Sequence, residues 1–387
     1  MNMINKLIVS SSPHMHGTDS VKKNMYGVLI ALLPALLISF YFFGSGAVLT
    51  TAVSVLACMF FEWAINTFLL KSKKITLTDG SAVITGVLLA FNVPSTLPIW
   101  MIIVGALVAI GVGKMTFGGL GNNLFNPALV GRVFLLISFP VAMTTWPAAT
   151  NTLLADNQTA TEQVDATSAA TPLALMKRIV KYQGTITKET QQLAANKDSL
   201  KQANLSATSQ KKIEKLVRES EATIQTSQAK LITTKAQLPT NLEMLVGQTK
   251  GSLGEVSALA LLLGLAYMLW KKIITWHIPV SIIGTVFIFA ALMHLINPLL
   301  FVAPQFHLFS GGLMLGAIFM ATDYVSSPMS HKGMLVYGVS IGFLTVVIRL
   351  FGAYPEGLSF AILIMNGFTP LINNYFKPRR FGRVVKK

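Results

Sequence analysis

The sequence is poor in cysteine and in acidic residues. Cys58 is the single cysteine, and 15 Asp and Glu stand against 31 Lys and Arg among 387 residues. One cysteine excludes an internal disulfide, a cysteine-ligated iron–sulfur cluster and a cysteine zinc site within this chain. His277, His294 and His307 lack the spacing of metal ligands. We therefore predict no metal site and expect these histidines at the membrane interface.

Charged residues of both signs are scarce, at 12% of the chain against 52% hydrophobic residues, and the mean hydropathy is +0.60. Runs of about 20 apolar residues recur, which is the length an α-helix needs to cross a bilayer core of roughly 30 Å. The predicted fold class is therefore an all-α polytopic membrane protein with about ten transmembrane segments. The first run begins near Asn24 and has no small-residue cleavage site after it, so we interpret it as a retained helix.

Polarity divides the chain into four parts. Residues 1–143 form a first membrane repeat, residues 144–250 a polar loop, residues 251–376 a second membrane repeat and residues 377–387 a basic tail. The predicted segments of the first repeat are 24–44, 46–70, a short one at 78–92, 97–115, and a helix that runs to about 143. Those of the second repeat are 251–270, 273–295, a short one at 310–323, 333–350 and 358–376.

The net charge of +16 would suggest a nucleic-acid partner in a soluble protein. Here the basic residues flank apolar runs, so we interpret them as topology signals and predict no nucleic acid. The basic positions fall on one side when the N-terminus is cytoplasmic: Lys22, Lys23, Lys71, Lys73, Lys74, Lys114, Lys271, Lys272, Lys332 and the tail. The positive-inside rule, by which basic residues gather in cytoplasmic loops, then predicts that both termini are cytoplasmic and that residues 144–250 are extracytoplasmic.

Within the polar loop, apolar residues recur every seven positions in two series. The series are Ile179, Ile186, Leu193 and Leu200, then Val217, Ile224, Leu231 and Leu238. This repeat predicts two long helices folded back as a helical hairpin. The favoured interpretation is an insertion with no function beyond docking a partner.

The two membrane halves resemble each other. Residues 86–92 and 316–322 are the ends of short third segments, and each is followed by polar residues and a proline. Five segments per half is an odd number, so the second half is predicted to be inverted, with polar backbone of broken helices near the midplane. The alternative is that the glycines only allow close helix packing, which would not require Asn92 and Asp323.

Thr171 stands in the stretch Asp165-Ala-Thr-Ser168-Ala-Ala-Thr171-Pro172. One interpretation is a helix N-cap followed by proline at the first helical position. The stretch also resembles the flavinylation motif of bacterial respiratory proteins, in which a flavin transferase joins the threonine hydroxyl to the phosphate of FMN. Ala169 stands where that motif often has glycine. The two interpretations are compatible because a phosphate at a helix N-terminus meets free N–H groups and the positive end of the dipole.

Further motifs extend the resemblance over most of the chain. Gly118-Gly-Leu-Gly121 with Asn126-Pro-Ala128, residues 251–257, residues 321–323 and residues 354–357 are similar to the D component of the Rnf complex. The sister family is the B component of the sodium-pumping NADH:quinone reductase, which usually has a longer N-terminal extension. The hairpin departs from the usual pattern.

The resemblance implies a membrane electron-transfer subunit of an ion-translocating ferredoxin:NAD⁺ oxidoreductase, a translocase in which no single component acts alone. It implies covalent FMN on Thr171, with Asp165 and Ser168 in the motif, and a non-covalent riboflavin in some members. The implied partners are the other Rnf subunits, a flavin transferase and the lipid bilayer, and the implied location is the bacterial cytoplasmic (inner) membrane. Na⁺ or H⁺ as the coupling ion, and the direction of the electrons, are left open.

Polar residues outside the motif are further candidates. Asn122, Asn123 and Asn126 could bond a flavin ring or cap a helix. Arg349 could meet the FMN phosphate or Glu356, and Glu356 itself is interpreted as an interfacial cap.

Acidic residues in apolar surroundings are candidates for an ion pathway: Glu62, Asp323 and Glu255. Helix caps are the alternative for Asp323 and Glu255, and a buried partner is the alternative for Glu62.

Two other functions stay open: a solute channel or permease with the same inverted repeats, and an assembly scaffold with a vestigial flavin motif.

Overall fold

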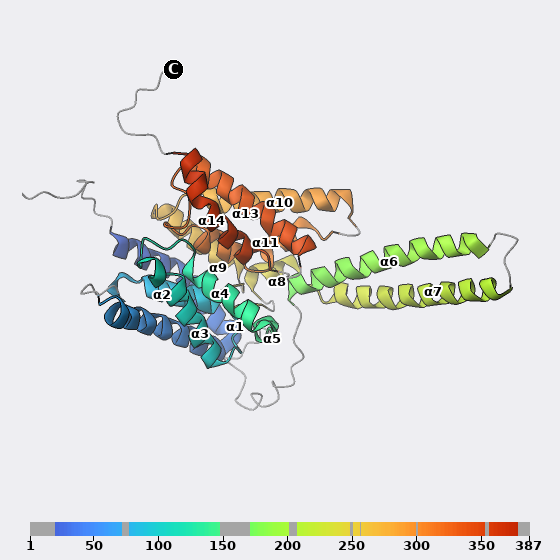
Figure 1. Cartoon of the computed structure of the whole chain (residues 1–387), viewed down its shortest axis with the longest axis horizontal. Helices are drawn as coiled ribbons and strands as arrows, with labels where there is room; N and C mark the ends of the chain where they lie inside the picture. Colours follow the sequence, from blue (N-terminus) through green and yellow to red (C-terminus); the bar gives the residue numbers. More distant parts are fainter. Residues whose placement is uncertain are drawn as a thin grey trace, which may run out of the picture.

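The computed structural model describes residues 20–71, 77–147, 171–200, 207–247, 251–255, 257–298, 301–352 and 356–377. Every regular element in these ranges is a helix. Apolar helices form a bundle, and two long polar helices project from one end of it (Figure 1). The predicted all-α class is confirmed.

The first half of the bundle begins with a broken helix. Its helices are α1 (Val21–Ala64, continued by a π-helix at Ile65–Leu69), α2 (Ser81–Phe91), α3 (Ile99–Leu107), α4 (Pro127–Ser138) and α5 (Pro140–Thr144). Helix α1 changes direction at Gly44, whose φ of 58° and ψ of −140° are not helical. Glycine reaches such positive φ without strain from a Cβ. This break separates the first two spans at the position predicted from the sequence.

The hairpin consists of α6 (Pro172–Leu200) and α7 (Ala207–Ala236), which pack along each other and are followed by α8 (Asn241–Val246). Ile179 at its base is buried, and the other residues of the predicted seven-residue series within the described side chains are half-buried. Ser220, Ser227 and Thr234 are buried too, also at seven-residue spacing. The seam of α7 thus alternates aliphatic residues with small hydroxyl residues. The helical hairpin is confirmed, and its extracytoplasmic location stays a prediction.

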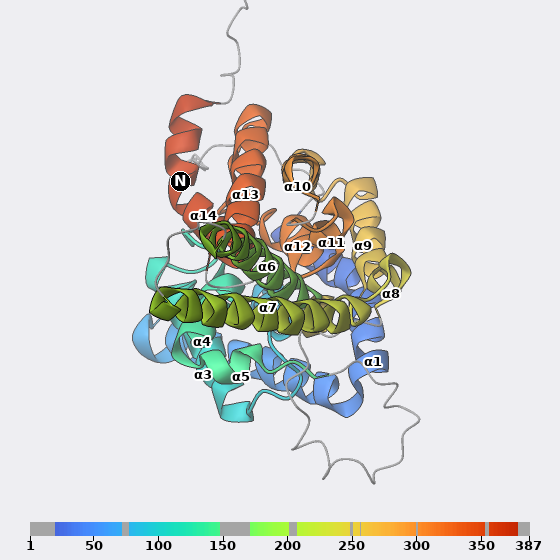
Figure 2. The same ribbon diagram turned by 90° about the vertical axis from the view of Figure 1, so that its right-hand side faces the viewer.

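The second half consists of α9 to α14. The bounds are α9 (Ala258–Trp270), α10 (His277–Ile296), α11 (Pro304–Phe309), α12 (Leu313–Leu315, continued by a π-helix at Gly316–Met320), α13 (His331–Phe351) and α14 (Leu358–Tyr375). Viewed from the hairpin end, α3 and α4 lie on one side of the hairpin and α10, α13 and α14 on the other (Figure 2).

Length and composition identify the helices that can cross a membrane. Four helical stretches qualify within the described residues: Val21–Leu69, Ile99–Phe117, His277–Ile296 and His331–Phe351. Shorter apolar helices lie at Ser81–Phe91, Pro127–Ser138 and Ala258–Trp270. Large apolar side chains such as Leu37, Leu56 and Ile288 point outward, as expected of surfaces solvated by lipid rather than water. The chain is a multi-pass membrane protein.

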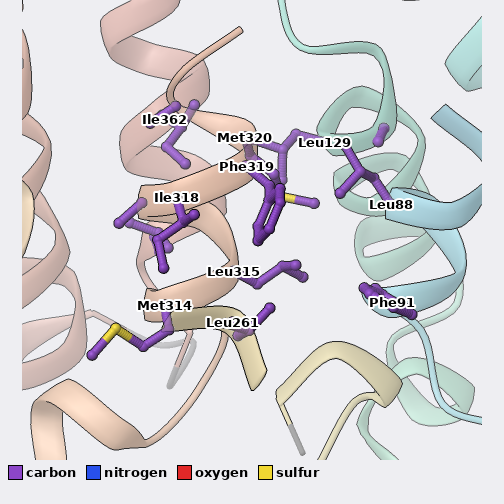
Figure 3. Packing of buried hydrophobic residues seen from close by; sticks show 14 of the residues in the cluster. Leu88, Phe91, Leu129, Leu261, Met314, Leu315, Ile318, Phe319, Met320 and Ile362 are labelled. Carbon is purple, nitrogen blue, oxygen red and sulfur yellow. The ribbon is translucent and has the colours of Figure 1, made fainter. Parts of the chain in front are cut away.

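The two short segments of the sequence pattern lie at the centre. Every described residue of α2 is buried or half-buried, and every residue of Leu313–Met320 is buried. Figure 3 shows Leu88 and Phe91 of α2 on one side of the core and Leu315 and Phe319 on the other. The halves therefore share one core. The inverted relation between them stays a prediction.

Close backbone approach joins the halves at α1 and α9. A Cβ on Gly264 would lie 2.4 Å from the carbonyl oxygen of Ala31 and 2.8 Å from Cζ of Phe319. Both are far inside van der Waals contact, so any larger residue at this position pushes α9 away from α1.

We predict that Gly264→Leu destabilises the protein by at least the roughly 1–3 kcal/mol typical of overpacked cores. The matched control is Gly284→Leu in α10, where a Cβ meets nothing within 4 Å. Thermal unfolding of the purified variants in detergent checks this. Equal unfolding temperatures for the two variants would contradict the close contact.

Candidate functional site

A cavity of about 90 Å³ lies between the halves at one end of the bundle. Ile273 and Ile274, just before the start of α10, line it, whereas His294 near the end of α10 lines a different cleft together with residues at the base of the hairpin. The cavity and the hairpin are therefore separated by the length of α10, about 30 Å for 20 residues. Its polar lining includes Lys114, Asn123 and Asp323.

Asp323 and Asn123 meet across the two halves in this cavity. The side-chain amide of Asn123 donates to Oδ2 of Asp323 at 3.1 Å, and the hydroxyl of Ser326 donates to the same oxygen at 2.9 Å. Phe319 and Met268 are among the apolar side chains that also line the cavity. Apolar walls with a few converging polar groups are typical of small-molecule sites in general.

Asn126 and Asn122 differ from Asn123. Oδ1 of Asn126 accepts from the backbone N–H of Leu129 at 3.2 Å, so Asn126 caps α4, and its Nδ2 donates to the carbonyl of Met320 at 3.1 Å. The cap interpretation is confirmed for Asn126, which also lines the cavity. Asn122 is exposed and is not part of the cavity lining.

Glu62 is fully buried and forms an ion pair with Lys114. Nζ of Lys114 lies 2.7 Å from Oε2 of Glu62 and 2.6 Å from the hydroxyl of Ser81. Ser81 in turn donates to Asp79 at 2.5 Å. A buried partner for Glu62 was one of the two interpretations from the sequence, and it is confirmed. Lys114 itself was interpreted only as a topology signal, because its sequence position beside a glycine-rich loop does not reveal that its side chain turns inward.

Thr171 lies at the other end of the bundle, where α6 begins. Its side chain is 5% exposed, and Oγ1 accepts from the backbone N–H of Ala174 at 3.2 Å. Pro172 occupies the first helical position. The N-cap interpretation is confirmed. Ser168 and Asp165 lie outside the described residues.

Two buried arginines occupy the membrane domain at this end. Arg132 forms an ion pair with Glu356 and also donates to the hydroxyl of Ser359. An arginine within the apolar stretch of α4 was a signal for such a pair that the sequence interpretation did not use. Glu356 is therefore an ion-pair partner of Arg132.

Arg349 uses its guanidinium to hold backbone groups of another segment. It donates to the carbonyls of His307 at 2.6 Å and of Ser310 at 3.0 Å. Glu356 pairs with Arg132 instead, so the predicted alternative of an Arg349–Glu356 pair is wrong.

Arg349 lies close to the start of α6. A Cβ built on Gly311 would lie 3.0 Å from Nη2 of Arg349 and 3.4 Å from Leu173, two residues after Thr171. A small cleft is lined by Leu173, Lys177 and Arg349. Lys177 donates to the carbonyl of Gly352, and burial lowers the pKa of Lys177.

Glu255 belongs to this end as well. A Cβ built on Gly312, the neighbour of Gly311, would lie 3.8 Å from its Oε1. That oxygen is buried and accepts no hydrogen bond from the described residues. The three acidic candidates for an ion pathway are thus divided, with Glu62 and Asp323 at the cavity end and Glu255 at the hairpin end.

Comparison with known proteins gives the family. The model of the NQR2, RnfD, RnfE family matches residues 8–382. The chain belongs to this family. Together with the relatives below, which are D components of such complexes, this confirms the resemblance that the motifs indicated.

Members of the family align with this chain over nearly its whole length. The D component of the Na(+)-translocating ferredoxin:NAD(+) oxidoreductase complex of Acetobacterium woodii is 39% identical over 384 residues, 99% of this chain and 97% of the relative. The D component of the proton-translocating ferredoxin:NAD(+) oxidoreductase complex of Clostridium ljungdahlii is 35% identical over 378 residues, which are 98% of this chain and 97% of the relative. The D component of the ion-translocating oxidoreductase complex of Erwinia tasmaniensis is 37% identical over 381 residues, which are 97% of this chain and 98% of the relative.

Breaking the buried pair should be costly. We predict that Lys114→Met destabilises the protein by on the order of 3–5 kcal/mol, because it leaves the Glu62 carboxylate buried without its cation. The double variant Glu62→Gln/Lys114→Met should recover much of this loss.

The control is Lys332→Met, which removes a lysine that is exposed. Unfolding temperatures in detergent measure all of these variants together with the single variant Glu62→Gln. If the double variant is as unstable as the sum of its two single variants, Glu62 and Lys114 are not coupled.

Proposed function

We propose that this chain is the membrane electron-transfer subunit of an ion-translocating ferredoxin:NAD⁺ oxidoreductase complex. Family membership over residues 8–382 and the names of the relatives support this. The chain is one part of a translocase and works with the other Rnf subunits. The coupling ion is Na⁺ or H⁺, both of which occur in the names of relatives.

FMN is proposed to be attached to Thr171 by a phosphoester bond. The observation that best supports this proposal is that Thr171, the last residue of the flavinylation motif, is the N-cap of α6. A phosphate there meets the N-terminal N–H groups of a 29-residue helix and the positive end of its dipole. Lys177 and Arg349 add positive charge nearby, so the residues present fit a phosphate. FMN supplies one- and two-electron transfer when bound.

We infer an order of assembly from the burial of Thr171. A flavin transferase needs access to the hydroxyl, and Thr171 is only 5% exposed in the folded chain. The proposal is therefore that the transferase acts before α6 packs against the membrane domain. Asp165 and Ser168 serve recognition in this step, as parts of the motif.

The cavity at the opposite end is proposed to hold the second, non-covalent flavin, riboflavin. Asn123 and Asp323 present an amide and a carboxylate to the polar edge of the ring, and Phe319 and Met268 present apolar surface to its faces. Riboflavin has no phosphate and needs no cation, and Lys114 is held by Glu62. Flavins at opposite ends of the bundle would place redox groups on opposite sides of the membrane.

The acidic residues at the two ends are proposed to serve the coupled cation. Glu62 and Asp323 lie at the cavity end and Glu255 at the hairpin end. Buried acids in membranes mark ion and proton paths.

The protein is proposed to lie in the inner membrane, with its hairpin end, residues 144–250, on the extracytoplasmic side. A solute channel is less well supported, because side chains fill the centre between the halves (Figure 3).

We predict that Thr171→Val abolishes covalent flavin, because valine keeps the shape and removes the hydroxyl. The variant should lose on the order of 1 kcal/mol of stability with the cap. In-gel flavin fluorescence of the denatured protein measures the attachment.

Two controls separate chemistry from structure. Thr240→Val removes another N-cap threonine, whose hydroxyl accepts from the backbone N–H of Glu243 at 3.3 Å at the start of α8. Thr167→Val removes a nearby hydroxyl outside the acceptor position. Both should fluoresce like the parent protein, and fluorescence that survives Thr171→Val would disprove the assignment.

We predict that Asn123→Leu reduces the non-covalent flavin several-fold and leaves covalent FMN unchanged. Asn122→Leu is the matched control, since Asn122 is the adjacent amide but is not part of the cavity lining. Flavin released by denaturation is quantified by chromatography, which separates riboflavin from FMN. Equal riboflavin in both variants would rule out Asn123 as a ligand.

A further inference from the structure

A second, larger cleft of about 280 Å³ lies where the base of the hairpin meets the membrane domain. Helix α6 contributes Ile179 and Gln183, and α7 contributes Lys235. The opposite wall consists of apolar residues around α11, including Phe301 and Phe306. This cleft shares no lining residue with the cavity between the halves.

The cleft lies at the boundary of the apolar belt. Helix α10 ends there, and His294 in its last turn lines the cleft. Beside it the side chains of Leu292, Leu295 and Ile296 are 54%, 76% and 75% exposed. Such strongly exposed aliphatic residues on a membrane-spanning helix face acyl chains. The last turn of α10 therefore combines a residue that lines the cleft with residues that face acyl chains.

Three polar side chains give the cleft its chemistry. Oε1 of Gln183 is buried and accepts no hydrogen bond from the described residues, so it requires a donor. Lys235, in the last turn of α7, brings a positive charge on an exposed side chain. His294 is already engaged, with Nδ1 2.7 Å from the carbonyl of Phe301. A ligand that uses both Gln183 and Lys235 as well as the apolar wall combines an apolar tail, a negative charge and a hydrogen-bond donor.

We propose that this cleft binds one molecule of phosphatidylglycerol. Its acyl chain packs between Ile179 and Phe306, its phosphate pairs with Lys235, and a glycerol hydroxyl donates to Gln183. Phosphatidylcholine has no donor in its headgroup. Phosphatidylethanolamine has a donor, but its ammonium would add positive charge beside Lys235. The bound lipid would fill the junction between the hairpin and the bundle.

The test uses the full-length protein purified in mild detergent and supplied with equal amounts of dioleoyl phosphatidylglycerol and dioleoyl phosphatidylcholine. Native mass spectrometry counts the lipids retained. We expect about one phosphatidylglycerol per chain, a several-fold loss in Lys235→Gln and in Val302→Trp, which fills the cleft, and no loss in Lys230→Gln. Lys230 is exposed on the same helix and does not line the cleft.

Gln183→Leu tests the headgroup separately, because it keeps the apolar volume and removes the acceptor. The preference for phosphatidylglycerol over phosphatidylcholine should fall several-fold in this variant. Equal retention of the two lipids by the parent protein, or equal loss in Lys230→Gln and Lys235→Gln, would overturn the proposal. Elution of each variant at the parent's position in size exclusion shows that it is folded.

Discussion

Peptide groups at the ends of a broken helix have no water to bond within a bilayer, and much of this structure follows from that constraint. Two short segments, α2 and Leu313–Met320, lie in the buried centre of the bundle. Side chains from surrounding helices bind backbone groups in and beside these broken segments. Asn126 donates to the carbonyl of Met320, and Arg349 donates to two carbonyls around the end of α11. The residues that hold the broken segments are therefore also residues of the candidate sites.

The same constraint explains the buried ion pairs. Glu62 and Lys114 come from different helical segments and neutralise each other away from water. Arg132 and Glu356 do so at the hairpin end, across the two halves. Each pair joins segments that are distant in sequence, so the pairs also specify how the helices assemble. Removing one partner leaves a charge where nothing else can solvate it.

Local patterns made part of this structure predictable. The break at Gly44, the hairpin, and the caps at Thr171 and Asn126 depend on neighbouring residues, and the sequence indicated each of them. Pairings over long sequence separations were not predictable in this way. The inward turn of Lys114 depends on Glu62, 52 residues earlier, and Arg132 meets a partner in the other half. For the same reason the amides of Asn122 and Asn123 looked equivalent in sequence, although only Asn123 reaches Asp323.

The straight hairpin also limits how a binding event can be transmitted. Helix α6 has 29 residues and is about 44 Å long. Charges in water are screened over roughly 8 Å at physiological salt. The charges of a protein that binds the tip of the hairpin are therefore screened from Thr171 at its base. Only a mechanical signal, a tilt or rotation of the whole hairpin, can therefore carry information from its tip to the membrane.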